Sequence, residues 1–355
     1  METNSIQENN QSQTPTPPPV AILIASHIFS AKRLYFLSEC IISLLCQTYQ
    51  SISIYLSISF DSEELKNLFS IMILQNASIH SANQHSTTKI YYFIQPQKTP
   101  QMRHIQLLCS EIAKYNVEGA AEPPHPWIFF SDDDDTYAPT RIEKFMERIR
   151  YCLFQLNTQH IQEEQFIGVY ENLIGKEHRQ QRHEYWCYCV RFSIIQRFFD
   201  KLAPYPDIID HKCCDIMLAE YFRRMRPDFY YSSIEETLYH YRRDESNEDS
   251  IIGTIGTLKT KIVRPSNPPD IHDIAIVDYL LDWNEYLHGD ENMNIYFHDT
   301  FLRTTTGTTF EYILKQEFLN DYPYLDFIDQ SHIKTLREYH EKIRKVCFEL
   351  YDIME

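Results

Sequence analysis

The feature that most constrains the fold is a repeated order of short apolar segments and amphipathic segments over residues 20–153. Val20–Ile24 is a continuous apolar run, typical of a strand buried on both faces, and residues 34–45 follow with helical spacing. The same order then predicts strands at 52–58, 89–95 and 127–131 and helices at 102–112 and 139–153. Strands that alternate with helices predict an α/β domain with a mainly parallel sheet covered by helices.

The second half of the chain is less regular. It predicts strands at 166–170, 185–190, 229–231 and 238–241 and helices at 192–202 and 212–225. A Pro- and Asn-rich linker at 264–270 precedes a Tyr-rich segment with mostly helical spacing. We therefore predict a flexible tail over 1–18, one α/β domain over 19–262 and a helical C-terminal extension over 263–355.

Charge and cysteine content narrow the class of protein. The 355 residues carry a formal net charge of -17 without a stripe of Lys and Arg, which argues against a nucleic-acid partner. Nine cysteines lack disulfide-framework spacing, and no apolar run approaches the roughly 20 residues that cross a bilayer. We expect a cytoplasmic protein with free thiols and no transmembrane segment. A zinc site from Cys187, Cys189, Cys213, Cys214 and His211 is an alternative to simple core packing, but CxxC pairs are absent.

Four consecutive aspartates, Asp132 to Asp135, follow the apolar segment Trp127–Ser131. Carboxylates this close repel one another unless protons, donors or a cation offset the charge, and Mg²⁺ prefers such oxygen ligands. Parallel sheets bind ligands at the carboxyl ends of their strands, where this run is predicted to lie. The alternative is a solvated acidic turn with screened charges. Because side chains alternate between the two faces of a strand, we expect Asp133 to point away from its neighbours and to be dispensable.

Two segments resemble family 2 glycosyltransferases of the GT-A fold. The first is Val20–Ser26 followed by Ser43-Leu-Leu-Cys-Gln-Thr-Tyr49. The second, Trp127 to Arg141, is similar to the family's metal segment, with an apolar strand, Asp-x-Asp-Asp, then Pro and a basic residue entering a helix. The two segments occur in the family's order, and the resemblance covers roughly residues 20–245.

The resemblance implies a GT-A, Rossmann-like glycosyltransferase domain over residues 19–262. Such a domain moves a hexose-type sugar from a nucleotide-diphosphate donor to an acceptor hydroxyl, with Mn²⁺ or Mg²⁺ as cofactor. It favours a UDP-sugar as donor and a carbohydrate or a protein as acceptor. The metal would neutralise charge that develops on the leaving diphosphate, and nearby carboxylates would stabilise an oxocarbenium-like sugar.

The resemblance assigns the family's site residues to the matching positions of this sequence. Asp134 is implied as a metal ligand, Asp132 as a ligand of the metal or the ribose, and Asp135 as a catalytic carboxylate toward the donor sugar. Asp215 is implied as the base of an inverting reaction, with Asp210 in reserve, although the Glu usually found before the base is Cys214. Asp215 is alternatively a favourable carboxylate near a helix N-terminus.

Further donor-binding residues are predicted at other strand ends and downstream, namely Ser26, Asp61, Gln101, Arg103 and either Arg242 or Arg243. Asp61 is the only acid where the family has paired acids followed by Gly and Ser, which leaves the uridine preference open. Asp244 stands where the family often has a His. His240 is displaced from that position, and it is either a metal ligand or a packed strand residue.

Two other functions stay open. The order Asp132-x-Asp134-x-Thr136 also fits phosphatases of the haloacid dehalogenase type, with Asp132 as nucleophile and Asp134 as acid/base. Such domains normally begin with that strand, whereas two strand–helix units precede it here. The altered elements at Asp61 and Asp244 also allow a catalytically inactive GT-A-fold binding protein, which would show no metal-dependent donor turnover.

Overall fold

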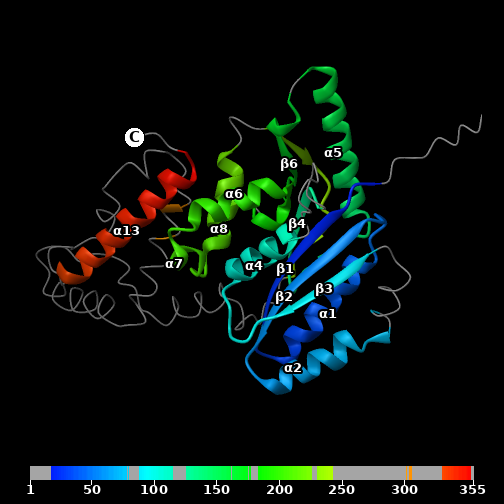
Figure 1. Ribbon diagram of the computed structural model, residues 1–355, viewed down its shortest axis with the longest axis horizontal. Coiled ribbons are helices and arrows are strands. Elements are labelled where there is room, and N and C mark those ends of the chain that lie inside the picture. Colours follow the sequence, from blue (N-terminus) through cyan, green and yellow to red (C-terminus); the bar gives the residue numbers. More distant parts are fainter. Residues whose placement is uncertain are drawn as a thin grey trace, which may run out of the picture.

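A seven-stranded sheet forms the centre of the protein (Figure 1). The computed structural model describes residues 17–77, 79, 88–114, 125–160, 162–174, 176, 183–225, 230–242, 301, 304–305 and 330–352. The strand order is β3-β2-β1-β4-β7-β6-β8. The strands are β1 (Val20–Ile28), β2 (Ile52–Phe60), β3 (Lys89–Ile94), β4 (Trp127–Asp132), β6 (Phe166–Glu171), β7 (Tyr188–Arg191) and β8 (Tyr230–Ile234).

The sheet is mainly parallel. β1 pairs in parallel with β2 and β4, β2 with β3, and β6 with β8, whereas β7 is antiparallel to both of its neighbours. Among the strands described, β7 alone therefore opposes the others. β1 lies in the middle of the parallel part, which explains why its apolar run is continuous and almost wholly buried.

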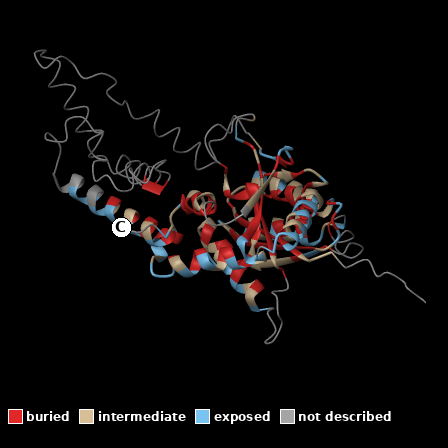
Figure 2. Cartoon of the chain, turned by 90° about the horizontal axis from the view of Figure 1, so that it is seen from above, coloured by how far each residue is buried: buried red, intermediate tan, exposed pale blue. Residues whose placement is uncertain are grey.

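Helices cover both faces of the sheet. α4, α6 and α8 lie on one side, and α1, α2 and α5 lie on the other (Figure 1). Figure 2 shows the buried strands between helices whose outer faces are exposed. The predicted α/β class, with a mainly parallel Rossmann-like sheet flanked by helices, is confirmed. The helices are α1 (Ala31–Leu45), α2 (Glu63–Phe69), α4 (Gln101–Lys114), α5 (Arg141–Thr158), α6 (Phe192–Leu202), α7 (Pro206–Ile209), α8 (Cys214–Arg224) and α13 (Gln330–Leu350), with short helical turns η1 (Ser70–Leu74), η2 (Glu163–Gln165) and η3 (Tyr185–Cys187).

Three local features differ from the sequence prediction. The predicted strand 185–190 begins as the 3-10 turn η3, and β7 starts only at Tyr188. α5 begins at Arg141 rather than at Pro139, whose carbonyl accepts the Thr48 amide at 2.9 Å. A two-stranded sheet of β5 (Thr136–Tyr137) and β9 (Tyr239–His240) follows the acidic segment. Two-residue strands are too short to show a period in the sequence.

A buried ion pair holds β9 beside the main sheet. The side chains of Arg141 and Glu171 are both fully buried, with Nε and Oε2 2.9 Å apart. The other oxygen of Glu171 accepts the amides of Leu238 and Tyr239, the latter at 2.8 Å. The guanidinium of Arg141 also lies over the ring of Tyr137, 4.2 Å from its centroid. This pair joins α5, β6 and the segment that enters β9.

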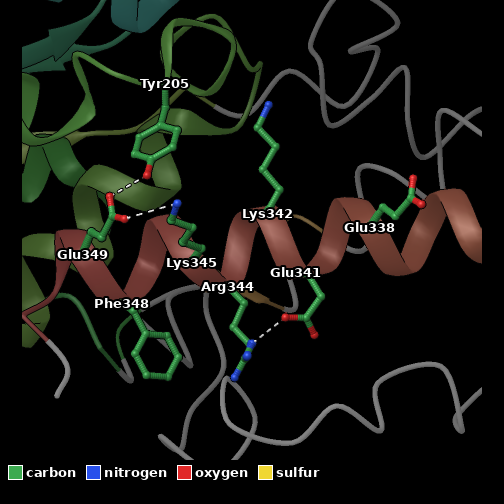
Figure 3. A pocket seen from close by; sticks show the side chains of 8 residues that line it. All are labelled: Tyr205, Glu338, Glu341, Lys342, Arg344, Lys345, Phe348 and Glu349. Atoms are coloured by element: carbon green, nitrogen blue, oxygen red, sulfur yellow. Dashed lines mark hydrogen bonds and ion pairs between the residues drawn. The ribbon is translucent and has the colours of Figure 1, made fainter. Parts of the chain in front are cut away.

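The part of the C-terminal extension that is described consists of Phe301, Thr304–Thr305 and residues 330–352. α13 buries Ile343, Val346 and Leu350 on one face, at helical spacing, and packs against α6. Polar contacts to the α7 region add to this, since the Tyr205 hydroxyl donates to Glu349 at 2.6 Å (Figure 3). The predicted boundary at 262 lies outside the described residues, the one at 18 lies at the start of the first described segment, and both stay predictions.

None of the helices described combines the length and the apolar content that a bilayer crossing requires.

Candidate active site

The acidic segment, Asp132 to Asp135, lies at the carboxyl end of the parallel strands. β1 and β4 are in parallel register with Ala25 opposite Asp132, so Ser26 at the end of β1 reaches the same edge. Asp132 ends β4, the chain then turns, and Asp135 leads into β5. The predicted ligand edge of the sheet therefore carries all four carboxylates.

Asp132 faces α4 and η3. Its Oδ1 accepts a hydrogen bond from Gln101 Nε2 at 3.1 Å and another from the Tyr185 hydroxyl. Burial raises the pKa of Asp132 well above its usual range, and the charges of Asp135 and Asp134 raise it further. Gln101 was predicted at the nucleotide, and the structure brings it to the first carboxylate of the segment. Sequence reasoning did not select Tyr185, because it belongs to a stretch read as a core strand.

Asp133 was expected to turn away from its neighbours, but it shares Arg33 with Asp134, so that expectation is wrong, while its dispensability stays a prediction. It lies in a turn rather than in the strand, so strand alternation does not apply to it. Its side chain is buried, Oδ2 accepts from Ser26 Oγ at 2.6 Å, and Oδ1 pairs with Arg33. Burial raises its pKa to about 6, while the Arg33 charge opposes that rise. Two donors on a buried carboxylate make Asp133 a structural anchor of the turn.

Asp134 pairs with Arg33, a residue of α1 that sequence reasoning missed. Arg33 Nη1 lies 2.7 Å from Asp134 Oδ2, and the Arg33 side chain is only 17% exposed. Burial lowers the pKa of Arg33, but the charges of Asp133 and Asp134 outweigh it and raise the pKa overall. No pattern marks Arg33, since a basic residue in the first turn of an amphipathic helix is ordinary.

Asp135 is held by the segment that follows β9. Its Oδ1 accepts the Arg242 amide at 2.7 Å, and Arg242 Nε donates to the Asp134 carbonyl at 2.7 Å. The guanidinium of Arg242 also pairs with Glu39 and lies 4.1 Å from the Phe36 ring centroid. Burial raises the pKa of Asp135 to about 7, and the charge of Asp134 adds to this. Arg242 thus contacts the acidic segment through its backbone as well as its side chain, while its predicted role at the donor stays a prediction.

Asp215 lies in the first turn of α8, and α8 packs against η3 and α4. Its charge raises the pKa of both Asp132 and the Tyr185 hydroxyl, which places it within electrostatic reach of the acidic segment. The reserve candidate Asp210 instead pairs with Arg103 at 2.8 Å. Arg103 also donates to the Pro206 carbonyl at 3.0 Å, so its guanidinium is engaged with the α7 region.

Asp61 follows β2 and pairs with His27 at the end of β1, with Oδ1 2.9 Å from Nε2. The Nδ1 atom of His27 lies 2.9 Å from Ser59 Oγ. Burial lowers the pKa of His27, Lys98 lowers it further, and Asp61 opposes them. The Asp61 side chain is 49% exposed at the edge of the sheet. Sequence reasoning did not single out His27, whose role depends on the parallel register of β1 and β2.

The Ser43–Tyr49 segment braces the chain just after the acidic segment. Gln47 Nε2 donates to the Ala138 carbonyl at 2.9 Å, and its Oε1 accepts the Ile142 amide at 3.2 Å. Ser43 Oγ accepts the Tyr137 amide at 3.1 Å. These polar side chains satisfy backbone groups of a non-helical connection. The motif therefore acts on the position of the acidic segment and does not line it.

A divalent cation fits the chemistry of Asp132 and Asp134, although not as a closed cage. Within the described residues, no three His, Cys, Asp or Glu side chains converge as a metal site. Magnesium usually takes one or two protein carboxylates together with substrate phosphates, so two carboxylates suffice. Among the described residues, Arg33 is the one guanidinium that pairs with the side chains of these four aspartates. Negative charge is thus left over for a cation to offset.

The remaining candidates lie elsewhere or outside the description. His240 is exposed on β9 opposite Thr136. The nine cysteines are free, and burial raises the pKa of the Cys187, Cys189 and Cys214 thiols, as expected for core residues. Arg243 and Asp244 lie outside the described residues. A pocket between Tyr205 and α13 is lined by none of the predicted site residues (Figure 3).

Comparisons with known proteins give low similarity. No protein-family model matches the chain, and no curated protein matches it. Among solved structures, TarS of S. aureus matches 94% of this chain at 9% identity with a TM-score of 0.39, and this chain spans 54% of TarS. A shorter TarS structure in complex with UDP matches at 9% identity and a TM-score of 0.41, with 94% and 90% of the two chains covered. The mannosyltransferase PcManGT from Pyrobaculum calidifontis, in complex with GDP-Man and Mn²⁺, matches at 11% identity and a TM-score of 0.43, with 96% and 89% covered.

Proposed function

We propose that this chain is a metal-assisted glycosyltransferase of the GT-A type, which transfers a sugar from a nucleotide-diphosphate donor to an acceptor hydroxyl. The observation that carries the proposal is the gathering of Asp132 to Asp135 with Gln101 at the carboxyl edge of a parallel sheet, with Asp215 in the first turn of the helix that packs against η3 and α4. Such an edge is where open α/β sheets bind ligands. Carboxylates gathered from a strand end and from a separate helix supply both ligands and a base.

Asp134 and Asp132 would hold Mn²⁺ or Mg²⁺, which supplies Lewis-acid neutralisation of the leaving diphosphate when bound. Asp215 takes the proton of the acceptor hydroxyl while that oxygen attacks the anomeric carbon and the bond to the diphosphate breaks. A single displacement of this kind inverts the anomeric configuration. Asp135 lies beside the sugar and stabilises its positive charge in the transition state.

The donor-binding proposal favours a UDP-sugar. Ser26 lies near the end of β1 and Asp61 follows the neighbouring β2 at this edge, and the half-exposed Asp61 would contact the nucleoside. Arg242, which contacts the acidic segment, and Arg103 on α4 would supply positive charge to the donor, and in this structure they pair with Glu39 and Asp210 respectively. A carbohydrate or a protein provides the acceptor hydroxyl.

Donor turnover tests this function. Purified protein is screened with UDP-, GDP- and TDP-sugars and Mn²⁺, and release of the nucleoside diphosphate is measured with and without EDTA. We expect one donor class to turn over, EDTA to abolish the reaction, and Asp134→Asn to reduce it at least 100-fold, as loss of a major electrostatic group does. Absence of turnover with every donor, or full activity of Asp134→Asn, would contradict the proposal.

The base assignment has its own matched pair of variants. Asp215→Asn and Asp210→Asn make the same chemical change on the same side of the sheet. Loss of a general base lowers the rate by about 10²–10⁴, so we expect this loss for Asp215→Asn. Asp210→Asn removes only the partner of Arg103 and should stay within a few-fold of the original rate. Equal effects of the two changes would remove Asp215 from this role.

A further inference from the structure

Arg33 occupies the place where a cation would be expected on the acidic segment. One guanidinium nitrogen, Nη1, contacts Asp134 at 2.7 Å, and the other, Nη2, contacts Asp133. Arg33 lies in the first turn of α1, immediately after the loop that leaves β1, so the backbone keeps it close to Ser26 and the turn. The same side chain lies 5.9 Å from the Phe29 ring centroid, which limits where it can move.

The two carboxylates that Arg33 bridges differ in how they are held. Asp133 is buried and also accepts the Ser26 hydroxyl at 2.6 Å, so it is anchored on two sides. The Asp134 side chain is 26% exposed, and Arg33 makes the only side-chain contact that the described structure gives it. Asp134 is therefore the carboxylate that can leave Arg33, while Asp133 keeps the guanidinium in place.

We infer that Arg33 is an internal cation that competes with the divalent metal for Asp134. This inference rests on the proposed function, because Asp134 is the proposed metal ligand. A guanidinium and a metal ion are both attracted by the Asp134 carboxylate, and each disfavours the other through like charge. Without donor, Arg33 pairs with both carboxylates and offsets the charge of the turn. With a metal ion bound to Asp134, Arg33 would pair with Asp133 alone, and its Nη1 would no longer contact Asp134. A released donor beside a bound diphosphate makes Arg33 a phosphate contact, since guanidinium groups pair well with phosphate oxygens.

Metal binding without donor tests the inference independently of activity. Free Mn²⁺ is titrated by electron paramagnetic resonance against the full-length protein and its variants. Arg33→Gln removes the competitor, and we expect Mn²⁺ to bind about tenfold more tightly, the equivalent of about 1.4 kcal/mol. Arg33→Lys keeps the charge but loses the planar two-pronged donor, so its affinity should fall between those of the original protein and Arg33→Gln.

Lys32→Gln is the matched control. It removes the same unit charge one residue earlier in the same helix, where the side chain is exposed and lies over Phe36 instead of contacting the turn. Screening weakens its influence, so less than a threefold change in Mn²⁺ affinity is expected. Circular dichroism checks that each variant folds, and Arg33→Lys carries the test if Arg33→Gln does not.

Three results would overturn the inference. The first is equal Mn²⁺ affinity of the original protein and the Arg33 variants, and the second is a gain in affinity for Lys32→Gln as large as that for Arg33→Gln. In either case Arg33 would not be a local competitor, while the proposed metal-dependent turnover would still stand. If neither the original protein nor the variants bound Mn²⁺, the competition and the metal assignment would both fail. Donor turnover in EDTA would then show separately whether the transferase function stands.

Discussion

The buried pair of Arg141 and Glu171 gives the sharpest stability prediction, for the substitution Glu171→Gln. Both side chains are fully buried, and the guanidinium is otherwise surrounded by aromatic rings. Removing the charge of Glu171 leaves Arg141 without its counter-charge in a site that water does not reach. Breaking one partner of a buried pair costs about 3–5 kcal/mol. That is a large share of the roughly 5–15 kcal/mol by which domains are stable.

Glu171 also accepts hydrogen bonds from backbone amides, so its substitution affects the position of the chain as well as the charge of the site. Its Oε1 accepts the amides of Leu238 and Tyr239, the residues that lead into β9 and toward Arg242. Glutamine has an NH₂ group in place of one carboxylate oxygen. This donor would face either the two backbone amides or Arg141, which are donors themselves. We expect the cost to lie in the upper half of that range and to loosen the link between β9 and the acidic segment.

Urea unfolding followed by circular dichroism measures the effect, with the midpoint compared at equal m-value. Glu236→Gln is the control: it makes the same chemical change in the segment before β9, but its ion pair with Lys144 is largely exposed. Pairs of that kind contribute at most about 1 kcal/mol. A Glu171→Gln loss no larger than that of the control would refute the reasoning. A double variant, Arg141→Met with Glu171→Leu, removes both charges and should lose less stability than Glu171→Gln, because no lone charge stays buried.

Further predictions concern other buried contacts. Gly168→Ala should destabilise the protein strongly, because an added Cβ would meet the Cys189 carbonyl oxygen at 2.0 Å; a melting temperature close to the original would contradict this. Gln47→Leu leaves buried backbone groups unsatisfied and should cost about 1–3 kcal/mol in thermal unfolding, whereas the exposed Gln50→Leu should have little effect. Burial lowers the pKa of His104 from 6.5 to about 4, so the unfolded chain binds a proton in that window and the folded protein does not. The contribution of His104 to the free energy of unfolding is therefore fully present above pH 6.5 and is lost as the pH falls toward 4, by up to ~3 kcal/mol. His104→Gln should flatten this dependence of the unfolding free energy on pH. An unchanged dependence would show that His104 is not the group responsible.

Much of the fold was predictable because periodicity records which faces of a segment are buried. The continuous run at Val20–Ile24 indicated a central parallel strand, and β1 lies between two parallel neighbours. Helix α6 occupies the predicted range, 192–202. Where the periodic signal was short or ambiguous, prediction failed, since η3 was read as part of a strand and the two-residue β5 was not predicted. β9 lies within the strand predicted at 238–241, but its pairing with β5, about a hundred residues away in the sequence, was not foreseen.

The sequence by itself determined that four carboxylates lie together, because consecutive residues cannot separate, and that they end a strand. The place of Gln101 at the start of the helix after the third strand made it a candidate, and the resemblance of residues 212–224 to a family segment made Asp215 one. Only the tertiary structure decided the partners of each carboxylate: Arg33 for Asp133 and Asp134, and Tyr185 for Asp132. Those contacts join segments about 50 to 100 residues apart, and they depend on strand register and on how helices are set on the sheet. A polar side chain in a local pattern carries no record of the distant group that it will meet.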